Sequence, residues 1–93
     1  MITEKLEAFI SEISTAPQYR DAVSQQPELQ TQVDAFASAL RFLDQKAAED
    51  ADMLESFDEI CRIIDRCDLS IKQRMLAVRE VFIRLRAAGR TIN

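Results

Sequence analysis

The sequence predicts an all-α domain, and three observations lead to this fold class. Between residues 28 and 88 there is neither proline nor glycine, the residues that most often interrupt regular structure. Three apolar series in this stretch advance by alternating steps of four and three residues, which keeps their side chains on one stripe of a helix. With one glycine and two prolines, the chain also has little material for the tight turns of a β-fold. The three series are Leu29, Val33, Phe36, Leu40 and Leu43; Met53, Phe57, Ile60, Ile64 and Cys67; and Ile71, Met75, Val78, Phe82 and Leu85.

The N-terminal part of the chain predicts two short helices. Thr3 can cap the first, which ends at residues 14–16. Its apolar stripe is Ile2, Leu6, Phe9, Ile10 and Ile13. Pro17 suits the first turn of a second helix over residues 17–25, and Pro27 ends that helix and opens the third.

The end of the third helix has two interpretations. In one, a single helix runs from about residue 28 to 67 and is ~60 Å long, because the apolar heptad continues through residues 47–52 except at Asp50. In the other, the helix breaks near residues 49–52, and Asp50 or Asp52 caps a new helix. Helix propensity favours continuity, whereas a mean helix length of ~11–12 residues favours the break. We favour the continuous helix and keep the break as the alternative.

A turn at residues 68–70 predicts the start of the last helix, with Asp68 or Ser70 as its cap. This helix runs over residues 71–88, and Gly89 stands where a left-handed terminating residue is expected. Residues 91–93 are expected to be a frayed tail. We therefore expect residues 1–93 to form one four-helix bundle-like domain with a C-terminal antiparallel helix; if the third helix is continuous, the last helix covers its second half.

Composition limits the classes of function. The net charge of −4 argues against a surface that binds nucleic acid as a whole. No apolar run approaches the ~20 residues that cross a bilayer, and the N-terminus lacks the layout of a signal peptide. We expect a cytoplasmic protein with no membrane contact.

The two cysteines and the absence of histidine argue against metal and redox sites. Cys61 and Cys67 would lie ~9 Å apart along a helix axis, too far for a disulfide, so we expect two small core residues in a reducing compartment. No histidine is present for zinc binding or for general base catalysis at neutral pH. We expect no metal, no cofactor and no catalytic residue.

Charge divides the C-terminal half. Residues 44–68 carry nine acids and three bases, and residues 69–93 carry six bases and one acid. A short turn joins the two segments, so they should lie antiparallel, with the opposite charges flanking one helical hairpin as in a coiled coil.

The last helix also has a second stripe, which alternates basic and aliphatic residues. The members of this stripe are Lys72, Leu76, Arg79, Ile83, Arg86 and Arg90. One interpretation is a wide core face bordered by arginine stems. Another is a docking surface for an acidic protein or for a second copy of the chain. A nucleic-acid surface is a third, less favoured because the neighbouring acidic helix would oppose its field.

Phe42 lies off the main stripe of its helix and is either core or part of an interface.

One short run resembles an enzyme family. Residues 62–68, Arg-Ile-Ile-Asp-Arg-Cys-Asp, followed by Arg74 and Met75, are similar to the arginine and Ile-Asp-x-x-Asp spacing of small all-helical chorismate mutases. The downstream arginine arrives too early, however, and the turn at residues 68–70 would divide the helix. We transfer no catalytic residues, and a small helical enzyme is the least favoured function.

The favoured function is a non-catalytic protein-binding adaptor, chaperone or regulatory inhibitor that acts through a helical face. Its physical profile is similar to that of many secretion chaperones, anti-activators and phage-encoded inhibitors, although no motif supports one of them. The expected contact residues are Phe42, Lys72, Leu76, Arg79, Ile83 and Arg86. If the long helix is real, it leaves an apolar face open, which a symmetric homodimer would cover. The alternative is a nucleic-acid-associated regulator that uses the basic last helix.

Overall fold

The all-α class is confirmed. In the computed structural model the described residues are 2–90, with side chains described from Glu4 onward, and this part of the chain forms five helices and no strand. The helices are α1 (Ile2–Thr15), α2 (Pro17–Gln25), α3 (Glu28–Ala47), α4 (Ala51–Ile64) and α5 (Ile71–Ala87).

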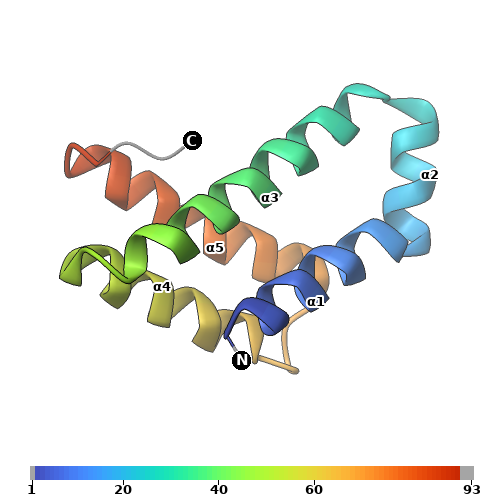
Figure 1. Cartoon of the computed structure of the whole chain (residues 1–93). Helices are drawn as coiled ribbons and strands as arrows, with labels where there is room; N and C mark the ends of the chain where they lie inside the picture. Colours follow the sequence, from blue (N-terminus) through green and yellow to red (C-terminus); the bar gives the residue numbers. More distant parts are fainter. Residues whose placement is uncertain (1, 91–93) are drawn as a thin grey trace.

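The five helices pack in a defined order (Figure 1). α3 returns beside α1, and α2 bridges the end where one passes to the other. α4 folds back against α3 and also contacts α1, and α5 packs on α4. Among the described helices, α3 and α5 are not a closely packed pair, although α5 passes behind α3 in the figure.

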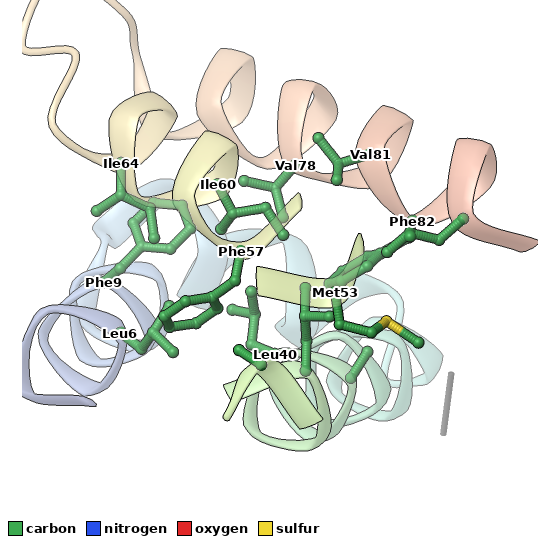
Figure 2. Close-up of a cluster of buried hydrophobic side chains, with 14 of the residues drawn as sticks. Leu6, Phe9, Leu40, Met53, Phe57, Ile60, Ile64, Val78, Val81 and Phe82 are labelled. Atoms are coloured by element: carbon green, nitrogen blue, oxygen red, sulfur yellow. The ribbon is translucent and has the colours of Figure 1, made fainter. Parts of the chain in front are cut away.

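The core lies where α1, α3, α4 and α5 meet. In Figure 2 the side chains of Phe57 and Ile60 on α4 lie among those of Leu6, Leu40 and Val78 from the other three helices. These five side chains are buried, and the described residues contain no buried polar or charged residue. The predicted apolar stripes therefore supply most of the core, and burial of their surface is the main force that holds the helices together.

The continuous helix that we favoured is wrong, and the alternative of a break is correct. A helix over residues 28–67 would be ~60 Å long, whereas the longest extent of the molecule is 39 Å. α3 ends at Ala47, and the Lys46 carbonyl accepts from the amides of Glu49 and Asp50 in a tight turn. The Asp50 carboxylate then caps α4, because Oδ1 accepts from the amide of Asp52 at 2.9 Å and from that of Met53 at 3.3 Å. The break lets α4 fold back and bury its apolar face against α3.

The prediction of two core cysteines is wrong for Cys67. α4 ends at Ile64, so Cys67 lies in the following turn and is exposed, whereas Cys61 on α4 is half-buried. Burial raises the pKa of the Cys61 thiol, which keeps it protonated. Both thiols are free.

The predicted ends of α2 and α5 are confirmed. Pro17 opens α2, and Gln25 is its last residue. At α5 the Ser70 hydroxyl accepts from the Gln73 amide, while the Gln73 side chain accepts from the Ser70 amide, so the two residues form a capping box. Gly89 has φ +85°, and the Arg90 and Gly89 amides donate to the carbonyls at the end of α5 as in a Schellman motif.

Two predictions fall on parts that the structure does not describe. α1 begins at Ile2, and the side chain of Thr3, its predicted cap, lies outside the described side chains. The predicted frayed tail, residues 91–93, also lies outside the described residues.

Candidate protein-binding groove

A groove of about 830 Å³ runs between α3 and α5. α3 forms one wall, α5 forms the other, and α2 closes one end with Tyr19 and Ala22. The α3 wall is Leu29, Gln32, Val33, Ala35, Phe36 and Ala39, and the α5 wall is Lys72, Met75, Leu76, Arg79, Phe82 and Arg86. The groove exists because α3 and α5 both pack against α4 but not closely against each other.

The floor of the groove is apolar and aromatic. Phe36 on α3 meets Phe82 on α5 edge to face, with ring centroids 5.9 Å apart, and meets Phe9 on α1 at 6.4 Å. Phe82 is buried, whereas Phe36 is half-buried because its outer face lines the groove. Phe36 therefore leaves part of its apolar ring facing the groove, which is costly unless a partner covers it, and the buried Phe82 supports that ring from α5.

The α3 wall includes two alanines. Ala35 and Ala39 are four residues apart, so they lie above one another on α3, and both face the groove. Side chains this small let the backbone of a bound segment approach α3 closely.

Three cations line the groove, and no described acidic residue does. Lys72, Arg79 and Arg86 are seven residues apart along α5, which places them on one edge of that helix. None of the three forms an ion pair with an acid among residues 4–90.

The other three bases of the C-terminal segment are used within the fold. Arg84 pairs with Glu59 of α4, and Arg90 Nη1 lies 2.9 Å from Asp50 Oδ2, which confirms that opposite charges flank the α4–α5 hairpin. Arg74 Nη2 lies 2.7 Å from Glu12 Oε1 of α1. The three groove cations are thus the bases of this segment that form no ion pair among residues 4–90.

Tyr19 fixes the α2 end of the groove. Its hydroxyl donates to Gln30 Oε1 at 3.1 Å, and Gln30 Nε2 donates to Asp34 Oδ1 at 3.0 Å. Burial, and then the charge of Asp34, raises the pKa of Tyr19, so the phenol remains protonated and able to donate. Beyond Tyr19 lies a smaller, mainly apolar hollow of about 190 Å³, which shares Lys72 and Met75 with the groove.

The structure brings together four of the six predicted contact residues. Lys72, Leu76, Arg79 and Arg86 line the groove, and Leu76 is 49% exposed at its rim. Ile83 is 43% exposed on α5 but does not line the groove.

Phe42, the sixth predicted contact residue, lies elsewhere. It is half-buried, packs against the core and carries Lys46 Nζ at 5.8 Å from its ring centroid. It does not line the groove.

Sequence reasoning missed the α3 wall. It assigned Phe36 to the core stripe and gave no role to Gln32, Ala35 or Ala39. The spacing of Ala35 and Ala39 beside an apolar stripe was the available sign of a close-approach face, but only the tertiary packing shows that this face looks toward α5.

The run that resembles chorismate mutases does not share one helix. α4 ends at Ile64, and in the turn that follows, Arg66 Nη2 pairs with Asp68 Oδ2 at 2.6 Å. Arg74 lies on α5, where its guanidinium donates to the Ile64 carbonyl and to Glu12.

No helix within residues 2–90 is long and apolar enough to cross a bilayer. In the same residues no group of three or more Cys, Asp and Glu side chains is placed to hold a metal ion.

No protein-family model, no curated protein and no solved structure matches the chain.

Proposed function

We propose that this domain is a non-catalytic protein-binding module that acts as an adaptor, chaperone or inhibitor and binds its partner in the α3–α5 groove. The observation that carries this proposal is the combination of an apolar groove floor with three cations that form no ion pair among residues 4–90. Aromatic residues, methionine and arginine are the types enriched at protein interfaces, and the groove presents Phe36, Met75 and two arginines together.

Site-specific photo-crosslinking tests the proposal. A benzophenone amino acid replaces Gln32, an exposed residue of α3 that lines the groove, and in a matched variant it replaces Gln45, an exposed residue of α3 outside the groove. In extract from the native host, after nuclease treatment, we expect a discrete protein adduct from position 32 and none from position 45. No adduct from position 32, or the same adducts from both positions, would contradict the proposal.

The nucleic-acid alternative has weaker support. Three cations seven residues apart match a phosphate backbone poorly when the surface beside them is an apolar floor, and the adjacent α4 carries exposed acids. Retention on DNA at low salt that weakens steeply toward physiological salt would restore this alternative.

The homodimer and the cytoplasmic location remain predictions from the sequence. The homodimer was inferred from the open face of a continuous helix, and α3 and α4 do not form such a helix. Light scattering on the purified domain measures its oligomeric state directly.

A further inference from the structure

We infer that the occupant of the groove is an acidic amphipathic helix of another protein, whose carboxylates lie seven residues apart. This inference rests on the proposed function and adds the chemistry of the partner. Lys72 and Arg86 bound the cationic edge, and the helical rise between them is ~21 Å, the length of about 15 residues. A partner helix with acids every seven residues has the same rise between them, so each carboxylate meets one cation, whether the helix runs parallel or antiparallel to α5.

The two walls predict the two flanks of the partner helix. All three cations stand on the α5 wall, whereas the α3 wall carries no charged residue. The partner therefore presents apolar residues downward to Phe36 and Phe82, acids toward α5, and small or neutral residues toward Ala35 and Ala39. This is the helix-in-groove mode, in which one face of an amphipathic helix supplies the anchors. The hollow beyond Tyr19 can take one bulky apolar side chain at the Lys72 end.

Charge disfavours a second copy of the chain as the occupant. In a two-fold contact whose axis crosses the groove, the cationic edge of α5 would approach the same edge of its partner. Like charges placed opposite one another oppose association. With the axis along the groove, that edge would instead meet the α3 wall of the partner, which carries no charged residue, so neither arrangement supplies the three cations with acids.

Surface outside the groove disfavours a small anionic ligand. Ile83 is 43% exposed on α5 and does not line the groove. A molecule that fits inside the groove would leave this side chain in water, whereas a helix with its flanking chain can extend over it.

The test is selection from an unbiased display library of amphipathic helical peptides of about 15 residues, followed by binding to three forms of the protein. The forms are the wild type, the groove variant Arg79→Glu/Arg86→Glu, and the control variant Arg20→Glu/Arg62→Glu. Arg20 on α2 and Arg62 on α4 are exposed, lie outside the groove and have no ion pair among residues 4–90. Both variants change the net charge equally, and circular dichroism verifies that each retains its helices.

We expect the enriched peptides to carry acids seven residues apart, on one edge of an apolar face. Their affinity should fall about tenfold or more on the groove variant, stay within about twofold on the control, and decrease as salt rises. Ala35→Glu, which places an acid on the neutral wall, should also weaken binding.

The remaining outcomes overturn the inference. Enrichment of neutral or basic peptides, equal losses on both double variants, no enrichment, or a stable homodimer that uses the groove would each do so. Neutral peptides that still lose affinity on Ala35→Glu would overturn only the acidic partner and leave the groove as a protein-binding site. Peptides indifferent to every groove substitution would count against the proposed function as well.

Discussion

Replacement of Asp50 by alanine tests the break between α3 and α4, because a break and a continuous helix predict opposite changes in the free energy of unfolding. The Asp50 carboxylate accepts from two amides at the start of α4 and also pairs with Arg90. Loss of an N-cap costs about 1 kcal/mol of unfolding free energy, and a partly exposed ion pair adds up to about 1 kcal/mol. We therefore expect Asp50→Ala to destabilise the domain by about 1–2 kcal/mol, a fall in Tm of roughly 5–15 °C.

A continuous helix through this point predicts the opposite. Alanine has a higher helix propensity than aspartate by up to about 0.7 kcal/mol in a helix interior, so Asp50→Ala would then leave stability unchanged or raise it. Urea unfolding followed by circular dichroism distinguishes the two, because a change of midpoint at constant m-value reports stability alone.

Two companion variants separate the cap from the ion pair. Asp50→Asn keeps a capping oxygen but removes the charge, and Asp52→Ala removes the second carboxylate that contacts Arg90 while the cap remains. Each should cost less than about 1 kcal/mol. If Asp50→Ala is no less stable than the wild type, or if all three variants lose equally, the capped break is refuted.

Three more predictions concern α5, the turn before it and the core. Gly89→Ala should cost about 1 kcal/mol by thermal unfolding, because φ is +85° while no atom lies within 4 Å of the new Cβ; an unchanged Tm would refute the left-handed terminus. The Arg66 guanidinium lowers the pKa of Asp68 from 3.8 to about 2. The stability from this pair is complete above pH 3.8 and is lost as the pH falls toward 2, so Asp68→Asn should flatten the acid limb of the stability profile there. Leu76→Ala, at an exposed site, should change unfolding free energy by less than about 0.5 kcal/mol yet weaken peptide binding, whereas Leu40→Ala in the core should cost about 2–5 kcal/mol; a large loss from Leu76→Ala would place it in the core.

Local chemistry made several elements of the fold predictable. Pro17 and Pro27 mark α2 because a proline fits only the opening turn of a helix. Ser70 and Gly89 mark α5 because one caps its start and the other adopts a conformation that other residues avoid. In each case the residue acts on its own neighbours, so no knowledge of the tertiary structure is needed.

The break at Asp50 was harder to predict because a tertiary gain decides it. Residues 47–52 are rich in helix formers, and Asp50 and Asp52 lower the helix propensity there by only tenths of a kcal/mol each. Folding α4 back buries Met53, Phe57 and Ile60, each of which contributes about 1.5–3 kcal/mol. The one warning in the sequence was Asp50 itself, the single acid that interrupts an otherwise apolar heptad.

The α5 wall of the candidate site was predictable from the sequence. The basic and aliphatic stripe that holds Leu76 and Arg79 follows from helix geometry alone. The opposite wall, with Ala35 and Phe36, does not, because it depends on how far apart packing on α4 holds α3 and α5. For the same reason the sequence could not decide whether Phe42 belongs to an interface or to the core.

The most direct test of the protein-binding groove is amide chemical-shift mapping of the isotope-labelled domain during titration with the partner segment that crosslinks at position 32. We expect shifts that cluster on α3 around Ala35 and on α5 from Lys72 to Arg86, and we expect their loss in the Arg79→Glu/Arg86→Glu variant. Shifts that cluster instead around Leu54, the exposed apolar residue of α4, would contradict it.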